Sequence, residues 1–333
     1  MKRWLAVVAF VVGGTTTTLA QVPVSGELSM SGGASTDEVQ AGAMQARVFG
    51  DTPWFRFLGE ATWATVSGPK SDVFGTAYPY EREVQVMEAY GERTFHPGPA
   101  IAGVRAGRFR TPFGIYNGAD HAYGGFLRAP MIRYLGYWAL SNTFLEHGVN
   151  VVAGVPALQA EYTLARPGES GDADERRRDG TDQVVRVQGY YRGLVLGASH
   201  ISTEPYQPAR YAKGRAIFNG FDARWMRSGF QLRGEWIDGQ PFDGMHTRGG
   251  YVDAFLHRRE MGPFTALARL EVLDYDAGAR SMFARRSTIG TRIHLVDSLY
   301  AQINRSHNSG KTLYSEYRNS TDLALTYTIR YPR

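Results

Sequence analysis

Arginines recur among alternating polar and apolar residues along this sequence, and their chemistry favours the binding of small anions. A guanidinium group stays charged and presents several N–H donors in a fork that fits an oxyanion. The arginines on the polar face of alternating stretches are Arg56, Arg105, Arg186, Arg224, Arg233, Arg269, Arg286, Arg292 and Arg330. Acidic residues on the same faces are fewer, namely Glu60, Glu161, Asp222, Glu235, Asp253, Glu271 and Asp322. If these faces line one aqueous space, the arginine excess predicts a raised local concentration of anions.

Ion pairing is the alternative role for these arginines, and the sequence leaves it open for each of them. Arg269 and Glu271 lie two residues apart on one face, as do Arg233 and Glu235, so each pair could neutralise itself. The total charge is also small, because two of the 37 basic residues lie in the leader described below and 35 remain against 32 acidic residues. We therefore expect a modest anion preference from the set of arginines as a whole.

Catalytic and metal-binding chemistry has little support in the sequence. His307 and Ser309 have the spacing of a His/Ser pair on one face of a strand, but the polar residues around them are typical of a strand exit. Asp274 and Asp276 supply two carboxylates, whereas calcium takes roughly six to eight oxygen ligands. Cysteine is absent, which excludes disulfides, thiol nucleophiles and thiolate metal sites. We expect no enzymatic activity, no cofactor, no metal ion and no nucleic-acid partner.

The elements that must position the arginines are β-strands, as strict period-two alternation shows. The clearest stretch is residues 321–331, whose apolar face consists of Leu323, Leu325, Tyr327, Ile329 and Tyr331. Its length of about ten residues is that of a tilted strand crossing a membrane. The same alternation recurs in residues 286–295, 264–272, 230–236 and 55–63. Charges in the middle of the second face require water there, so the pattern predicts an antiparallel transmembrane β-barrel, an all-β fold.

The N-terminus and the composition agree with an exported barrel. Lys2 and Arg3 precede an apolar run over residues 5–12, and Thr18 and Ala20 occupy the small-residue positions of a cleavage site, so residues 1–20 are predicted to be a signal peptide. No later stretch is apolar enough for a transmembrane helix, and the mean hydropathy is −0.32. The chain is nevertheless rich in aromatic residues (13%) and in glycine (39 residues). Composition alone would also fit a periplasmic β-sandwich or propeller.

Connection lengths favour the barrel over those alternatives. Short connections with turn residues, such as Arg192-Gly193 and Arg227-Ser228-Gly229, alternate with long polar stretches, such as residues 67–82, 111–145 and 166–182. Short turns on one rim and long loops on the other are typical of membrane barrels. With a first hairpin between Val24 and Phe49, the count is sixteen strands, and fourteen or eighteen are also compatible. Residues 21–333 are predicted to form this one barrel.

The longest connection, residues 111–145, is predicted to fold into the barrel and narrow its pore. Loops of this length are usually functional. It contains Tyr116, Tyr123, Phe126, Tyr134, Tyr137, Trp138 and Phe144, more aromatic residues than an exposed surface loop carries. Arg128 and Arg133 are the candidates to line the constriction. Alternatively, the aromatic residues form a packed plug or a subunit contact, and the two arginines extend past them to water.

Several segments resemble the phosphate-selective porin O and P family. Residues 108–114, Arg-Phe-Arg-Thr-Pro-Phe-Gly, resemble the strand end of that family that reads G-x-F-x-x-P-F-G, and they carry most of the resemblance. Glu88-Ala-Tyr-Gly, Gly234-Glu-Trp-Ile and residues 269–274 are similar to other strand motifs of the family. The resemblance implies a sixteen-stranded trimeric porin in which arginines and a lysine cluster guide phosphate. The lysines are not matched, because only Lys70, Lys213 and Lys311 follow the leader, in or beside predicted outer loops.

The sequence thus predicts a porin of the bacterial outer membrane that lets small hydrophilic solutes diffuse passively and prefers anions, phosphate-like anions among them. The predicted partners are outer-membrane lipid, small inorganic or organic anions and two further copies of the chain in a homotrimer. Two alternatives stay open. The barrel could be a non-conducting receptor or scaffold that acts through its outer loops, or, more remotely, an outer-membrane phospholipase that uses His307 and Ser309.

Overall fold

The fold is seen in a computed structural model that describes residues 23–67, 84–115, 127–133, 145–167, 181–203, 215–241, 246–276, 281–310 and 319–331. The predicted signal peptide and most of the predicted outer loops, including every aromatic residue named above for residues 111–145, lie outside these ranges. Within the described ranges, no helix is long and apolar enough to cross a membrane.

Sixteen strands make up nearly all of the described chain, as the alternation predicts. They are β1 (Val24–Ser35), β2 (Gln40–Asp51), β3 (Arg56–Ser67), β4 (Gln85–Phe95), β5 (Ile101–Arg110), β6 (Leu145–Val155), β7 (Leu158–Pro167), β8 (Asp182–Tyr191), β9 (Leu194–Thr203), β10 (Ala216–Arg227), β11 (Phe230–Gln240), β12 (His246–Leu256), β13 (Phe264–Asp276), β14 (Met282–Val296), β15 (Leu299–Gly310) and β16 (Ser320–Tyr331). Two single-turn 3-10 helices, η2 (Met131–Arg133) and η4 (Arg259–Met261), accompany them.

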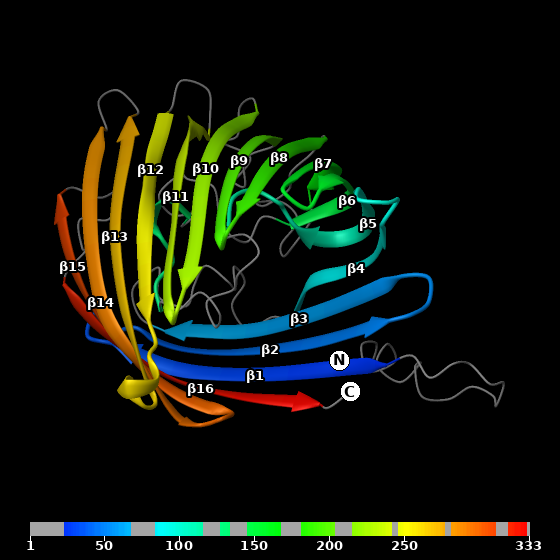
Figure 1. The fold of residues 1–333 in the computed structure, drawn as a ribbon. Coiled ribbons are helices and arrows are strands. Elements are labelled where there is room, and N and C mark those ends of the chain that lie inside the picture. The colour runs from blue at the N-terminus through cyan, green and yellow to red at the C-terminus, as the bar shows by residue number, and fades with distance from the viewer. Residues whose placement is uncertain are drawn as a thin grey trace.

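The strands form one closed antiparallel barrel (Figure 1). Each strand pairs with its neighbours in the sequence, and β1 closes the ring by pairing with β16 from Gly26 opposite Tyr331 to Ser35 opposite Asp322. Closure leaves no strand edge unpaired, which a barrel in lipid requires because no water is available there to satisfy backbone groups. The predicted fold, sixteen strands and the first hairpin included, is confirmed.

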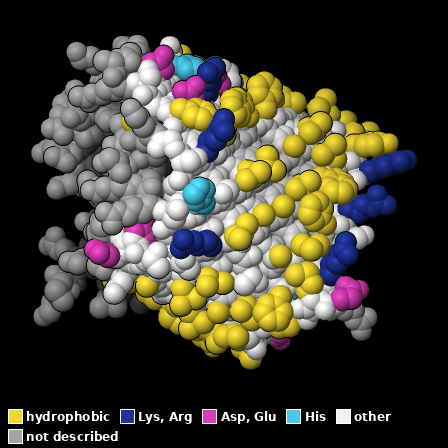
Figure 2. Space-filling view, turned by 90° about the vertical axis from the view of Figure 1, so that its left-hand side faces the viewer, with side chains coloured by type: hydrophobic (Ala, Val, Ile, Leu, Met, Phe, Trp, Pro, Cys, Tyr) yellow, Lys and Arg dark blue, Asp and Glu magenta, His cyan; other side chains and the backbone are white. Residues whose placement is uncertain are grey.

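The two faces of the barrel wall differ as the sequence alternation predicts. In β16, Leu323, Leu325 and Ile329 are exposed on the outside, whereas Asp322 and Thr326 are buried inside. Figure 2 shows that such outward hydrophobic side chains form a band across the outer face, with Lys and Arg side chains along its borders. A continuous apolar band around a closed barrel is the surface that contacts lipid in membrane barrels.

Connections between strands differ in length at the two ends of the barrel. At one end they are residues 52–55, 96–100, 156–157, 192–193, 228–229, 257–263 and 297–298. At the other end they are residues 36–39, 68–84, 111–144, 168–181, 204–215, 241–245, 277–281 and 311–319. We call these the short-turn end and the long-loop end.

Two of the short turns show why their residues were recognisable in the sequence. Arg192 and Gly193 have φ of 46° and 82°, and Ser228 and Gly229 have φ of 48° and 77°. Two consecutive residues with positive φ form the tight hairpin turn that fits the twist of paired strands. At the long-loop end, β11 extends to Gln240 and β12 begins at His246, so the connection between them is residues 241–245.

Candidate functional site

The polar inner wall of the barrel brings most of the predicted arginines together with carboxylates of neighbouring strands. Arg269 of β13 and Arg233 of β11 both face Asp253 of β12, which lies between them in the strand register. The Nε atom of Arg269 is 2.5 Å from one oxygen of Asp253, and the Nε atom of Arg233 is 2.9 Å from the other. One buried carboxylate therefore serves two arginines.

The pairs that looked self-neutralising in the sequence are not the closest ion pairs. Glu271, two residues from Arg269, instead binds Arg286 of β14, with Nε and oxygen 2.5 Å apart. Glu235, two residues from Arg233, binds Arg133, which belongs to the long connection inside the barrel and not to a strand of the wall. The reason is geometric, because residues opposite each other on paired strands have Cβ atoms about 4.5–5.5 Å apart, closer than residues two apart along one strand.

The remaining predicted arginines on the wall divide into paired and unpaired groups. Arg186 contacts Asp222 at 2.9 Å, and Arg105 contacts Glu92 at 2.8 Å. Two others are more exposed: Arg56, at the short-turn end, has 67% of its side chain exposed beside Asp51 at 2.7 Å, and Arg330 contacts Glu27 at 3.0 Å. All of these arginines are ion-paired.

Arg224 and Arg292 form the unpaired group, because neither has an acidic partner among the described residues. Arg224 lies opposite Arg233 in the β10–β11 register. Its NH2 donates at 3.0 Å to Gln188, whose amide oxygen, when turned toward the arginines, also accepts from Arg186. Arg292 donates to Gln302 at 3.1 Å and lies 4.4 Å from the ring centre of Tyr300. Among the residues that the structure describes, no carboxylate balances the positive charge of either arginine.

A segment of the longest connection, residues 127–133, lies inside the barrel against this wall. Its second residue, Arg128, is 4% exposed, with Nε 2.7 Å from Asp322 of β16 and NH2 2.9 Å from Asp37 in the β1–β2 turn. Arginines of the wall also bind the backbone of this segment. Arg269 donates to the carbonyl of Arg128 at 2.8 Å, and Arg286 donates to the carbonyl of Ala129. The segment crosses from β16 to β13 along these contacts.

The helix η2 ends the described part of this segment and is fixed in the same way. The backbone N–H of Met131 donates to Glu271 at 2.9 Å. Arg133, fully buried, binds Glu235, donates to the carbonyl of Phe113 at 2.9 Å and lies 5.2 Å from the ring centre of Phe113. Arg133 thus links the two described parts of the long connection, residues 111–115 and 127–133, to the strand β11.

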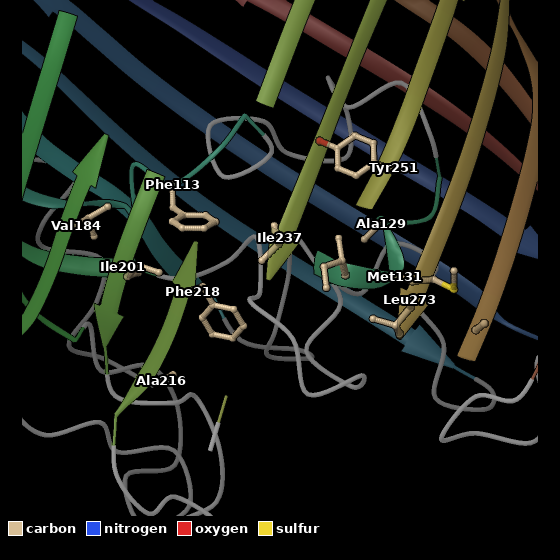
Figure 3. Close-up of a cluster of buried hydrophobic side chains, with 12 residues drawn as sticks. Phe113, Ala129, Met131, Val184, Ile201, Ala216, Phe218, Ile237, Tyr251 and Leu273 are labelled. Carbon is tan, nitrogen blue, oxygen red and sulfur yellow. The ribbon is translucent and has the colours of Figure 1, made fainter. Parts of the chain in front are cut away.

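Hydrophobic contacts reinforce these polar ones. Phe113, Ala129, Met131 and Ile132 from the long connection share a buried cluster with inward residues of β8–β14, including Phe218 and Ile237. Figure 3 shows the labelled side chains of this cluster spread along the strands from Val184 to Leu273, with Phe113 and Met131 among them. The described part of the connection therefore lies within the barrel. Arg128 and Arg133, expected to line a constriction, are buried in ion pairs, and their lining of the pore stays a prediction.

Sequence reasoning missed a second charge network near β3. Glu60 binds both Arg47 of β2, with Nε and oxygen 2.6 Å apart, and Arg110 at the end of β5. Arg110 also contacts Glu88 at 2.5 Å. Alternation along β5 predicts an outward Arg110, and it holds as far as the buried Phe109. Arg110, the last residue of the strand, is nevertheless buried and turns inward, where the strand pattern no longer applies.

The residues considered for catalysis and calcium binding lie apart from this interior. His307 and Ser309 are on the outer face of β15, and no hydrogen bond joins them, which a nucleophile and its base require. Asp274 contacts Arg248 at 2.8 Å. Within the described ranges, no group of three or more His, Cys, Asp or Glu residues could hold a metal ion.

Comparison with known proteins identifies the fold. No protein-family model matches the sequence, and no curated protein matches it. Solved structures do match. Salmonella typhi OmpF in complex with daunomycin has a TM-score of 0.63 at 10% identity over 92% of this chain and 97% of its own. Pseudomonas putida OprB has a TM-score of 0.62 at 8% identity, over 93% of this chain and 94% of its own. An anion-selective porin from Comamonas acidovorans has a TM-score of 0.59 at 11% identity, over 92% of this chain and 99% of its own. The chain therefore has the closed-barrel fold of porins.

Proposed function

We propose that the chain is a porin of a bacterial outer membrane, through which small hydrophilic solutes diffuse passively with a preference for anions. The observation that carries the anion preference is the pair Arg224 and Arg292, inward-facing arginines for which the described residues provide no carboxylate. A fixed positive charge beside an aqueous path raises the local concentration of anions. Rings of basic side chains are one basis of anion selectivity in pores.

Three kinds of observation support the proposal that the barrel conducts solutes. The barrel is closed and carries an apolar outer band, its inner wall is polar, and it shares its fold with porins. The described part of the long connection runs along the wall from β16 to β11, where Arg128 and Arg133 hold it by ion pairs. We propose that this segment narrows the lumen without spanning it, so that Arg128 and Arg133 shape the constriction through their contacts with the wall.

Phosphate-like anions are a candidate substrate class, supported by the resemblance of residues 108–114. Arg110 within that motif is engaged with Glu60 and Glu88, so its charge is balanced. We therefore propose a general anion preference, with phosphate as one permeant ion among others. The assembly that we propose is a homotrimer in outer-membrane lipid.

Planar-bilayer recording tests the proposal directly. Protein refolded into detergent and added to a bilayer is expected to produce stepwise increases in ion conductance. Under a potassium chloride gradient, the reversal potential is expected to have the sign of a chloride-preferring pore. A reversal potential of the opposite sign would reject the anion preference, and a correctly folded protein without conductance would favour the receptor or scaffold role.

A further inference from the structure

The outer surface of the barrel carries a groove of about 940 Å³ that extends across β9–β15. Its long side chains point outward from the wall, with Phe221 64% and Leu270 65% exposed, and Trp236 and Val252 are exposed beside them. Over β9–β13 the exposed lining is apolar. Because these residues lie on the outer face, the groove opens to the surrounding membrane and is separate from the lumen.

Small residues in the middle of the wall create the depth of this groove. Ala223, Gly234 and Gly250 occupy outward positions on β10, β11 and β12, between the larger residues named above. At Gly250 a Cβ atom would clash with the backbone carbonyl oxygen of Glu235. The close approach of β11 and β12 therefore requires glycine there, and the groove floor has no side chain at that point.

The β14–β15 side of the groove is polar and basic. Arg285 and Ser287 of β14 line it together with His307 and Ser309 of β15. In the register, Ser287 lies opposite His307 and Arg285 lies opposite Ser309, so these four side chains form one compact patch. Arg285 lies 4.9 Å from the ring centre of Phe283, and among the described residues neither Arg285 nor His307 has an acidic partner.

The position of this patch fits the depth of a lipid headgroup. Arg285 and Ser309 lie near the ends of β14 and β15 that adjoin residues 277–281 and 311–319, which is the long-loop end. The apolar lining lies on the other side of the patch, over β9–β13. An exposed arginine without a carboxylate, next to an apolar groove in a membrane surface, complements a phosphate attached to a hydrocarbon chain.

We propose that this groove binds a membrane lipid with an anionic phosphate headgroup, with an acyl chain along Phe221, Trp236 and Leu270 and the phosphate at Arg285 and His307. This proposal requires that the barrel span a membrane, but it does not require that the barrel conduct ions. The groove lies on the opposite side of the wall from Arg224 and Arg292, so the two proposals can fail separately.

Native mass spectrometry of the full chain, refolded from denaturant into lipid-free detergent, tests the site. The probes are phosphatidylglycerol, which has a net negative charge, and phosphatidylcholine, which has none. The wild-type protein is expected to retain phosphatidylglycerol more strongly. An arginine near a membrane surface contributes about 1 kcal/mol, so the double variant Arg285→Gln/His307→Gln is expected to bind phosphatidylglycerol about five-fold more weakly. The matched control is Arg227→Gln, which removes an exposed arginine at the short-turn end of β10.

A second variant tests the apolar half of the groove. Ala223→Leu adds an apolar side chain on the lipid-facing surface, where folding tolerates it, and is expected to weaken retention of both lipids. Ala254→Leu, at an outward alanine of β12 outside the groove, is the control. Single-channel conductance is expected to be unchanged in all four variants. Unchanged lipid retention in both test variants would overturn the proposal. Loss of subunit association in Ala223→Leu would also overturn it, because a second copy of the chain would then occupy the groove.

Discussion

At the scale of single residues, the role of an inward arginine depends on which side chain the neighbouring strand places opposite it. Asp253 lies opposite both Arg233 and Arg269, and its carboxylate forms an ion pair with each of them, which offsets much of their positive charge. Arg224 stands opposite another arginine and donates to an amide. Since a salt bridge cancels most of the field that an ion in the lumen would experience, the unpaired arginines should dominate anion selectivity.

Replacing the unpaired arginines is therefore expected to weaken anion preference. A unit charge about 10 Å from an ion in water changes its energy by about 0.4 kcal/mol, which is roughly a two-fold change in local concentration. We expect Arg224→Gln and Arg292→Gln each to reduce the anion-to-cation permeability ratio by about this factor. Reversal potentials should be measured at low salt, because screening extends over about 10 Å at 0.1 M.

The control for this experiment is Arg227→Gln, which removes an outward arginine from the same strand as Arg224. It should leave the permeability ratio unchanged. Equal effects of Arg224→Gln and Arg227→Gln would mean that selectivity follows the net charge of the molecule and does not depend on the inner wall.

At the scale of elements, ion pairs hold residues 127–133 against the inner wall of the barrel. Replacement of Arg133 by leucine would leave Glu235 buried without its partner, and breaking such a pair costs about 3–5 kcal/mol. We expect Arg133→Leu to detach this segment and to raise single-channel conductance. The measurement is the conductance step in a planar bilayer, with limited proteolysis as a second readout of the detached segment.

The double variant Arg133→Leu/Glu235→Leu distinguishes the loss of this ion pair from a nonspecific destabilisation of the protein. Replacing both members of a buried pair by apolar residues is often close to neutral, so this variant is expected to return conductance and protease resistance toward wild-type values. If the double variant is more damaged than the single one, the segment is not held mainly by this pair.

At the scale of the whole molecule, the outer band decides whether the barrel is stable in lipid. Ile289 lies at the middle of β14 and is strongly exposed on the outer face. An arginine at the centre of a membrane barrel's outer face costs about 2–4 kcal/mol. Ile289→Arg is therefore expected to lower the free energy of unfolding from lipid vesicles by this amount. The uncharged Ile289→Ala should lower it by clearly less, and equal losses would contradict a lipid-facing position.

The proposed homotrimer also belongs to this scale. Chemical cross-linking of the protein in detergent, followed by a denaturing gel, should give a ladder that ends at three chains. Heating before cross-linking should abolish the ladder. A ladder that stops at one chain would leave the barrel monomeric without affecting the proposals for the lumen or the lipid groove.

The sequence by itself determined the barrel, because alternation along a strand is a local property. Side chains of a strand point to opposite faces in turn, so Leu323 to Ile329 on one face and Asp322 to Thr328 on the other already separate lipid from water. The tight turns at Arg192-Gly193 and Ser228-Gly229 were equally local, since the glycine of each turn readily takes a positive φ. These features could be recognised without knowing any contact.

Only the tertiary structure decided which charges meet. The partner of an arginine depends on strand register and on which distant segment returns to the wall, and neither is encoded in spacing along one strand. Thus Glu235 binds Arg133 from a connection far away in the sequence, and Arg110 at the last position of β5 turns inward to Glu60. The outer groove likewise arises from small residues on three separate strands, which come together only when those strands pair in register.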